Sequence, residues 1–266
     1  MKMTWLTDLH LERVDEKRRL AFYDTLKKSG GDAIVITGDI SNAQLLPTHL
    51  LELGRSCSPR PVYFVLGNHD FYGSCFADVD RDVARVCAGQ SNLRHLGHGE
   101  TIPLGGDAAL IGHRGWADGR SGWGASTSHE NPDANEITDL RGMSNQAQFK
   151  KMNELGMASG VYFRETLPYA LQCYRHVLIA THVPPFTSAV YYNGKPCDKV
   201  HQPFYSNISA GGVIRGIAGH YRSRKVTVLC GHTHSGAVVD IADGLQVRAG
   251  SARPGWPGPQ ESIDLN

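Results

Sequence analysis

The sequence predicts an α/β fold with a largely parallel sheet. In the first third of the chain, short apolar runs rich in β-branched residues alternate with segments of helical periodicity. This alternation is typical of right-handed βαβ crossovers, which bury parallel strands on both faces. Acidic, amide and imidazole side chains directly follow several of the apolar runs. Because ligands bind outside the carboxyl ends of parallel strands, the same pattern predicts a functional site there.

The elements of the first third alternate strictly. We expect helices where apolar residues recur at three- and four-residue spacing, and Pro47 is expected to break the second helix near its start. The expected strands are residues 4–7, 33–37 and 62–66, and the expected helices are residues 15–28 and 44–53.

The remaining elements are less regular. A helix at 76–88 precedes three short strands of a meander, and a long helix is expected to be interrupted at Gly156, Gly160 and Pro168. The later expectations are strands at 93–96, 101–104, 108–112, 177–181, 226–230, 237–241 and 245–249, helices at 146–172 and 210–220, loops at 116–135 and 184–203, and an irregular tail at 254–259 that wraps onto the body or frays.

Length and composition limit the possible classes. The 266 residues, 41% of them hydrophobic, are expected to form one domain, residues 1–266, with a lid or insertion around 116–160. The net charge of +1 argues against bulk electrostatic binding of nucleic acid. No membrane span or leader is visible, and six scattered cysteines without a CxxC pair indicate reduced thiols. We therefore expect a cytoplasmic protein that does not bind membranes.

Five strand-end segments carry the candidate chemistry. Each follows an expected strand, so all five are expected to meet in one crevice. Their nitrogen and oxygen donors suit Mn, Fe, Zn, Ni or Co better than Ca, and their number is too large for one ion. The segments are Asp8-Leu9-His10, Gly38-Asp39-Ile40-Ser41-Asn42, Gly67-Asn68-His69-Asp70, Thr181-His182 and Gly231-His232-Thr233-His234.

Each segment also has a purely structural interpretation. Asp8-Leu9-His10 alone is also typical of a turn, and Asp39 alone is also typical of a helix cap. A lone histidine such as His182 most often satisfies its hydrogen bonds inside a core. The two segments that begin at Gly67 and Gly231 are more specific, because each places polar side chains after a tight glycine turn. The combination of all five favours a metal site.

Together these motifs resemble the calcineurin-like metallophosphoesterase superfamily. The resemblance extends over about 90% of the chain, with Asn42 standing where many members have Asp or Glu. It implies a four-layer sandwich of two central mixed β-sheets flanked by α-helices, with a dinuclear site of two divalent or trivalent transition-metal ions. By this resemblance, Asp8, His10, Asp39 and His234 hold one ion, and Asn68, His182, His232 and the shared Asp39 hold the other.

The resemblance also implies catalytic roles. A metal-bound hydroxide is the expected nucleophile on phosphorus. His69 is expected to stabilise the transition state and to help protonate the leaving oxygen, and Asp70 is expected to orient His69 through a hydrogen bond. Arg114, which opens the glycine- and serine-rich loop, can reach a substrate phosphate bidentately, or it is a solvated surface residue.

The expected activity is metal-dependent hydrolysis of a small or nucleotide-like phosphoester, with monoesterase and diesterase both open. The loop 184–203 can supply an aromatic and basic wall for a base or sugar, or simply pack on the body. A protein phosphatase is an alternative. A non-catalytic metal-binding scaffold of the same fold is another, although the presence of His69 and every ligand position argues against it.

Overall fold

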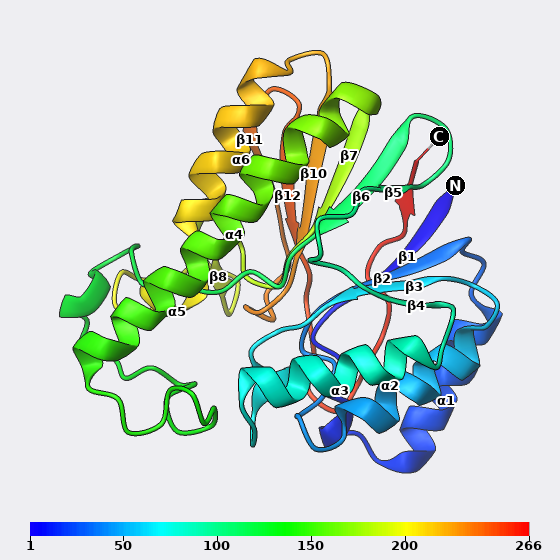
Figure 1. The fold of residues 1–266 in the computed structure, drawn as a ribbon, viewed down its shortest axis with the longest axis horizontal. Helices are drawn as coiled ribbons and strands as arrows, with labels where there is room; N and C mark the ends of the chain where they lie inside the picture. Colours follow the sequence, from blue (N-terminus) through cyan, green and yellow to red (C-terminus); the bar gives the residue numbers. More distant parts are fainter. Residues whose placement is uncertain (266) are drawn as a thin grey trace.

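The computed structural model describes residues 1–265 and contains two large mixed β-sheets that face each other (Figure 1). The first sheet has the order β13-β1-β2-β3-β4, and the second has the order β11-β12-β10-β7-β6-β5. The strands of the first sheet are β1 (Lys2–Leu6), β2 (Ala33–Thr37), β3 (Val62–Val65), β4 (Leu93–His95) and β13 (Ile263–Asp264). Those of the second are β5 (Ile102–Pro103), β6 (Ala108–Gly112), β7 (His176–Ala180), β10 (Lys225–Cys230), β11 (Ala237–Ala242) and β12 (Leu245–Ala249).

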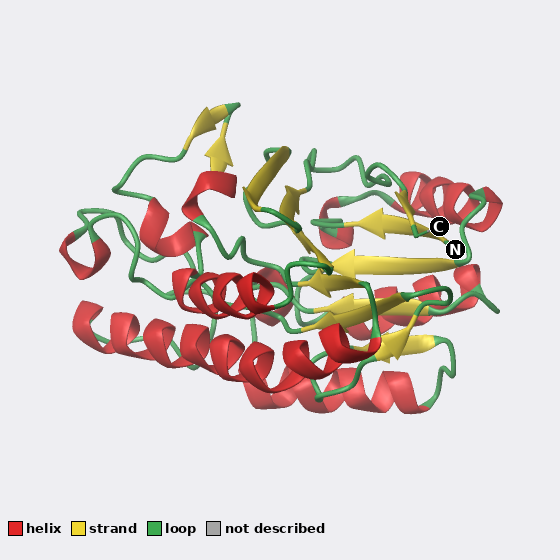
Figure 2. Ribbon diagram, turned by 90° about the horizontal axis from the view of Figure 1, so that it is seen from above, coloured by secondary structure: helices red, strands yellow, loops and turns green. Residues whose placement is uncertain are grey.

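Helices cover the outer face of each sheet. The first sheet is covered by α1 (Glu16–Lys28), α2 (Leu46–Cys57) and α3 (Phe76–Ala88), and the second by α4 (Asn145–Cys173) and α6 (Ile208–His220). The 90° view shows α4 running along the outside of the strands (Figure 2). The sequence-based expectation of an α/β fold with four layers is therefore confirmed.

Strand β2 shows how the sequence builds these layers. All five of its residues are buried, and its side chains alternate between two apolar clusters. Ile34 and Ile36 pack with the helices, whereas Ala33 and Val35 pack between the two sheets. Alternation with a period of two is a property of every strand, and here both faces meet an apolar partner. Burial of each isoleucine contributes about 1.5–3 kcal/mol.

Helix α4 is continuous over 29 residues, so the expectation of interruptions at Gly156, Gly160 and Pro168 was wrong. Gly156 permits close packing, because a Cβ there would lie 2.3 Å from the Cβ of Asp118. The Asp118 carboxylate in turn accepts hydrogen bonds from the backbone and hydroxyl of Ser209 in α6. Tertiary packing has overridden the low helix propensity of glycine.

Other local expectations also need correction. Pro47 lies in the first turn of α2 and does not break it. The three short strands after α3 do not form one meander, because β4 pairs in parallel with β3 while β5 and β6 form an antiparallel pair in the other sheet.

The two long loops contain ordered elements. Segment 116–135 contains one short element, the 3₁₀ turn Gly124–Ser126. Trp116, Asp118 and Asp133 in this segment are buried, so the segment does not lie only on the surface as expected. Its movement as a lid stays a prediction. Segment 184–203 includes a small hairpin and the start of a helix. The elements there are the 3₁₀ turn Thr187–Ala189, β8 (Tyr191–Tyr192), β9 (Lys195–Pro196) and α5 (Gln202–Tyr205).

The tail wraps onto the body. The guanidinium of Arg18 lies 4.2 Å from the centre of the Trp256 ring, and the backbone N–H of Gln260 donates to the carbonyl of Trp5 at 2.8 Å. Strand β13 then pairs antiparallel with β1, opposing Ile263 to Met3. Within the described residues, no helix is both long and apolar enough to span a lipid bilayer.

Candidate metal centre

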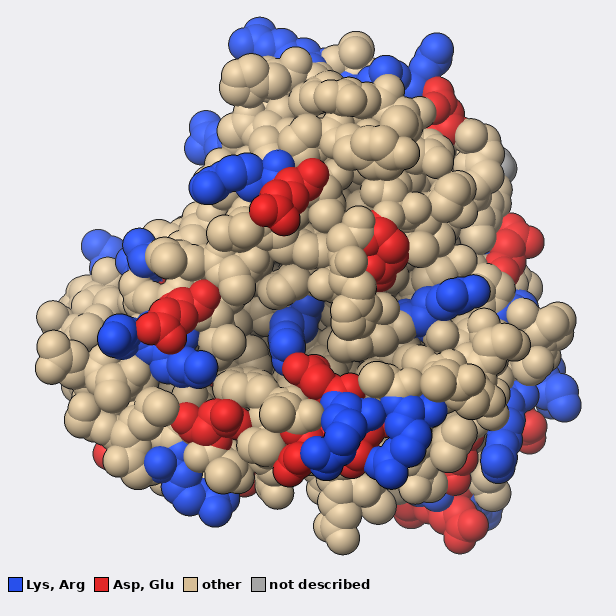
Figure 3. All heavy atoms as spheres, in the orientation of Figure 1, with Lys and Arg blue, Asp and Glu red and all other residues tan. Residues whose placement is uncertain are grey.

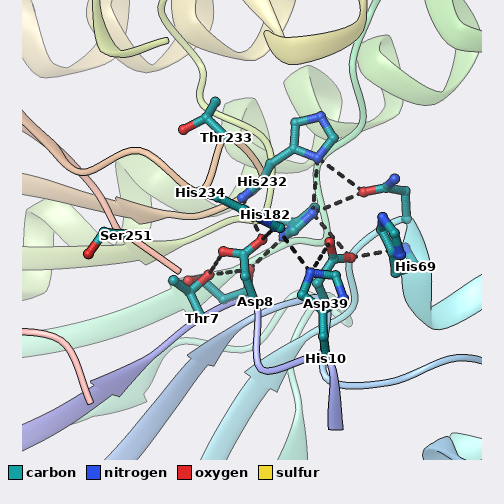
Figure 4. Close-up of polar contacts among 12 residues, drawn as sticks. Thr7, Asp8, His10, Asp39, His69, His182, His232, Thr233, His234 and Ser251 are labelled. Carbon is teal, nitrogen blue, oxygen red and sulfur yellow. Dashed lines mark hydrogen bonds and ion pairs between the residues drawn. The ribbon is translucent and has the colours of Figure 1, made fainter. Parts of the chain in front are cut away.

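Side chains from the ends of strands in both sheets meet in one cluster (Figure 4). Asp8 follows β1, Asp39 follows β2 and Asn68 follows β3 in the first sheet. His182 follows β7 and His232 follows β10 in the second. The structure therefore brings together segments more than 220 residues apart in the sequence, as the backbone N–H of His232 donates to Asp8 Oδ1 at 2.9 Å.

The first group of donors consists of Asp8, His10, Asp39 and His234, with one donor atom from each lying within 4.8 Å of the others. His10 Nε2 is 3.1 Å from His234 Nε2 and 3.7 Å from Asp39 Oδ2. His234 Nε2 is 3.4 Å from Asp8 Oδ1. Two carboxylates and two imidazoles thus point at one small volume.

The second group shares Asp39 with the first. Asp39, His182 and His232 also have donor atoms within 4.8 Å of one another. His182 Nε2 lies 3.3 Å from Asp39 Oδ1, and Asn68 Oδ1 lies 3.1 Å from both His182 Nε2 and His232 Nδ1. The two oxygens of Asp39 therefore face different groups, Oδ2 towards His10 and Oδ1 towards His182.

An unusual backbone presents these side chains. Asp8, His10, Asp39, His232 and His234 all have positive φ, between 42° and 72°. Such conformations are uncommon for residues other than glycine and cluster at functional sites, where the surrounding structure maintains them.

Glycines let the ligand segments approach closely. A Cβ added at Gly67 would lie 2.2 Å from Asp39 Oδ1, and one at Gly231 would lie 2.0 Å from Thr7 Oγ1. Neither position has room for a side chain, so glycine is required there for steric reasons.

The buried carboxylates of the cluster are stabilised by positive charge next to them. Burial opposes the ionisation of Asp39, but His182, His69 and His10 hold its pKa well below the usual value. Burial likewise disfavours a charged His182, yet the Asp39 carboxylate raises the pKa of His182 to about 10.

The donor set fits two transition-metal ions. It consists of carboxylate, amide and imidazole donors, which suit Mn, Fe, Zn or Ni and differ from the all-oxygen shell that Ca prefers. One carboxylate faces both groups, as a bridging ligand would. The residues present therefore fit a dinuclear centre.

Several partners fix the orientation of the ligand side chains. His182 Nδ1 is 2.8 Å from the carbonyl of Thr37, which leaves Nε2 for the cluster. The His232 ring is oriented the other way round. Its Nε2 lies 2.9 Å from the carbonyl of Phe204, and its Nδ1 faces the cluster. On the far side, His10 Nδ1 lies 3.4 Å from Glu12 Oε1. Such outer partners are typical of metal-binding imidazoles.

Asp133 is a site residue that the sequence did not reveal. It is buried, and its Oδ1 accepts hydrogen bonds from Asn68 Nδ2 at 2.8 Å and from the Tyr72 hydroxyl at 2.7 Å. The amide nitrogen of Asn68 is therefore held away from the cluster, and its oxygen is presented to the histidines. Asp133 lies within an aperiodic loop, where no strand end or motif marks it.

His69 lies at the edge of the cluster. Its ring centre is 4.6 Å from that of His10 and 4.1 Å from that of Tyr72, and its backbone N–H donates to Asp39 Oδ1 at 2.9 Å. The ring is partly exposed, and His69 belongs to neither of the two groups that share Asp39, although its donor atom lies within 4.8 Å of donor atoms of His10 and Glu12. This position suits a residue that contacts a substrate bound at the cluster.

The expected hydrogen bond between the His69 ring and the Asp70 carboxylate is not formed among the described residues. Instead, Asp70 Oδ1 accepts from the backbone N–H groups of Ile40 and Ser41, and Oδ2 accepts from that of Gly67, all at 2.8 Å. Asp70 thus ties the loop that carries Asp39 to the loop that carries Asn68. Asp70 therefore fixes the backbone beside two candidate ligands.

Arg114 is also placed differently from the expectation that it reaches a phosphate. Its guanidinium pairs with both oxygens of Asp80 in α3, at 3.3 and 3.1 Å, and lies over the ring of Phe71. A bidentate pair of this kind uses the donors that a phosphate would need. The structure does not present Arg114 to the cluster as an unpaired cation.

The sequence itself matches a known family over most of its length. The calcineurin-like phosphoesterase family matches residues 1–236, which include every candidate ligand. The chain belongs to this family. It is accordingly a metallophosphoesterase, a metal-binding hydrolase of phosphoester bonds.

Solved structures with similar folds include a dimetal phosphatase and a 5'-nucleotidase. A dimetal phosphatase from Danio rerio superposes with a TM-score of 0.58 and 15% identity, over 94% of this chain and 86% of that one. A 5'-nucleotidase from Candida albicans SC5314 superposes with a TM-score of 0.52 and 9% identity, over 94% of this chain and 46% of that one. At these identities the likenesses show the fold. No curated protein sequence matches the chain at a significant level.

Proposed function

We propose that this metallophosphoesterase uses a dinuclear centre to hydrolyse a phosphoester of a small molecule or nucleotide. Asp8, His10, Asp39 and His234 would hold one ion, and Asn68, His182, His232 and Asp39 the other. The observation that carries the proposal is the orientation of Asp39, whose two oxygens face the two donor groups. The likeness to a 5'-nucleotidase supports a phosphorylated small molecule as substrate.

The chain's own residues contribute binding, orientation and proton transfer. Two bound metal ions would supply charge neutralisation of the phosphoryl oxygens and a lowered pKa for an attacking water. His69 stands beside the cluster, where its ring would donate a hydrogen bond to the phosphoryl group and a proton to the leaving oxygen. Asp70 acts indirectly, because it fixes the two loops that carry Asp39 and Asn68.

Charge and cysteine usage support a small substrate and a cytoplasmic location. Lys and Arg are interspersed with Asp and Glu on the face seen in Figure 3, without a broad basic surface of the kind that binds nucleic acid. The six cysteines all lie in the described part of the chain and are free. Free thiols are the rule in reducing compartments.

A metal-reconstitution assay tests the proposal. The protein is stripped with a chelator, reloaded with Mn²⁺, Zn²⁺, Fe²⁺ or Ni²⁺, and assayed with p-nitrophenyl phosphate and bis-p-nitrophenyl phosphate. The preferred ester separates a monoesterase from a diesterase. Asp39→Ala should lower turnover by about 10³-fold or more and reduce the bound metal, because both ions lose a ligand. His69→Ala should lower turnover by about 10²–10⁴-fold at unchanged metal content.

Asp24→Asn is the matched control, since Asp24 is an exposed carboxylate on α1. It should keep full activity and metal content. Retention of two equivalents of metal and of turnover by Asp39→Ala would contradict the proposed ligand set. Loss of metal in His69→Ala would show that His69 is a ligand and not a proton donor.

A further inference from the structure

A cavity close to the candidate metal centre is built by the segment around the β8–β9 hairpin. It has a volume of about 680 Å³, within the usual range for small-molecule sites. Tyr191, Tyr192 and Lys195 come from the hairpin, while Tyr205 comes from α5 and His129 from the preceding long loop. Two segments that are distant in the sequence therefore form its walls.

This cavity lies next to the second donor group, although no candidate ligand lines it. Thr233, between the candidate ligands His232 and His234, lines it, and Figure 4 shows Thr233 beside the cluster. Tyr205, another wall residue, has its ring centre 5.1 Å from that of His232. A phosphoester held at the metal centre would therefore place its organic part within reach of the cavity.

Aromatic rings form part of the walls. Three tyrosines line the cavity, and the ring centres of His129 and His201 lie 4.5 Å apart with the two ring planes inclined at 57°. Tyr192 is 64% exposed, although a tyrosine ring is a large apolar surface to leave in water. Rings of this kind offer faces for stacking to a planar ligand, and each stacked base contributes about 1–3 kcal/mol in nucleotide-binding proteins.

The charges around the cavity argue against recognition of a polyanion. Lys195 and Asp198 carry opposite charges on the lining, and the Asp198 carboxylate contacts His201 Nδ1 at 2.8 Å. A site for a polyphosphate tail would concentrate Lys and Arg donors instead.

From these contacts we propose that the cavity, here called the hairpin pocket, binds an aromatic or heterocyclic ring in the alcohol part of the phosphoester. The inference rests on the proposed function, because the metal centre would hold the phosphate of the same molecule. The expected substrate class is therefore a phosphoester of a ring-bearing alcohol, such as a nucleoside, as opposed to a simple sugar phosphate.

Binding of alcohols that the enzyme cannot hydrolyse tests the pocket separately from catalysis. Adenosine, uridine and p-nitrophenol are titrated calorimetrically into the metal-loaded protein, with ribose as the ligand that lacks a ring. At least one ring-bearing probe should bind about 10-fold tighter than ribose or more. Tyr192→Ala should lower that affinity about 5- to 100-fold, and Tyr192→Phe should retain it, because stacking needs only the ring.

Tyr169→Ala is the matched control. Tyr169 is 61% exposed, close to the value for Tyr192, but it lies on α4 and does not line the hairpin pocket. This variant should bind the same probe with unchanged affinity. Equal losses in Tyr192→Ala and Tyr169→Ala would overturn the inference, as would probes that all bind no tighter than ribose.

The two proposals fail in different ways. Metal-dependent ester hydrolysis without preferential ring binding would overturn the hairpin pocket and leave the proposed function intact. Ring binding that depends on Tyr192, in a metal-loaded protein that hydrolyses no phosphoester, would overturn the proposed function and support the pocket as a ring-binding site.

Discussion

The metal centre and the hairpin pocket adjoin at His232 but are held in place differently. The candidate ligands of the centre follow buried strands, and His182 and Asp39 are almost fully buried. Their backbone is fixed by hydrogen bonds between loops, such as those accepted by Asp70. The hairpin that carries Tyr191 and Tyr192 is a two-stranded sheet of two residues in each strand, and most of its residues are exposed.

Under the two proposals, the rigid metal centre would carry out the reaction and the exposed hairpin would select the substrate. Ligand atoms must stay within a few tenths of an ångström of the productive geometry, so they are placed on the rigid part of the fold. A short hairpin is marginally stable by itself and can change its sequence at little cost to the rest of the protein. We therefore expect substitutions in the centre to affect folding, metal binding and turnover together, and substitutions in the pocket to affect ligand choice alone.

The largest effect on stability and metal binding is expected from the Gly67→Ala substitution. Its Cβ would lie 2.2 Å from Asp39 Oδ1 and 2.7 Å from His182 Nε2, so two ligands must shift. We expect a loss of about 3 kcal/mol in the free energy of unfolding, together with loss of metal binding. Chemical denaturation and metal analysis measure the two effects.

Gly212→Ala is the control for this substitution. Gly212 is exposed within α6, and its added Cβ would meet nothing within 4 Å. Alanine there should stabilise the protein by about 0.5–1 kcal/mol. A Gly67→Ala protein with unchanged stability and metal content would show that the centre is less rigid than its contacts indicate.

Metal binding should have the next largest effect on the stability of the folded protein. An ion that binds only the folded state stabilises it by about 2.7 kcal/mol at a free concentration one hundred times its dissociation constant. Thermal unfolding of the stripped protein should therefore shift upwards on addition of Mn²⁺. The shift should persist in Asp24→Asn and vanish in Asp39→Ala, and an equal shift in both variants would place the bound metal elsewhere.

Asp133→Asn tests the outer support of the centre. The asparagine side chain can offer an N–H₂ group to Asn68, which would allow the Asn68 amide to turn its nitrogen towards His182 and His232. We expect metal affinity to fall about 10- to 100-fold, as measured by competition with a chelator. Tyr72→Phe removes one donor to Asp133 but keeps the bond from Asn68, so it should have a smaller effect.

The smallest effect on stability is expected in the hairpin pocket. Tyr192→Ala removes a ring that is largely in water, so the free energy of unfolding should change by no more than about 0.5 kcal/mol. Denaturation curves for this variant and the wild-type protein should coincide. A loss of 2 kcal/mol would mean that the hairpin is part of the rigid body and would remove the contrast with the centre.

The parts of the site that the sequence revealed are those tied to strands. Asp39, Asn68 and His232 stand directly after apolar runs, and parallel strands must end at the same edge of a sheet. The fold class followed from the alternation of apolar runs with helical segments in the first third of the chain. Asp133 was missed because its contact with Asn68 depends on the path of an aperiodic loop. The pairing of Arg114 with Asp80 likewise depends on where α3 packs, which no local pattern specifies.

The short strand β13 was missed because two residues carry no periodicity. It pairs with β1, which leads into Asp8, so the sheet beneath the first ligand is completed by Ile263 and Asp264. During synthesis on a ribosome, β1 and its neighbour β2 emerge early, but β13, the partner on the other side of β1, is made more than 200 residues later. Folding that depends on such distant pairing is slow, and the donors of the centre stay apart meanwhile. Metal binding at the proposed centre would thus come late in the folding of each new chain, after both sheets have formed.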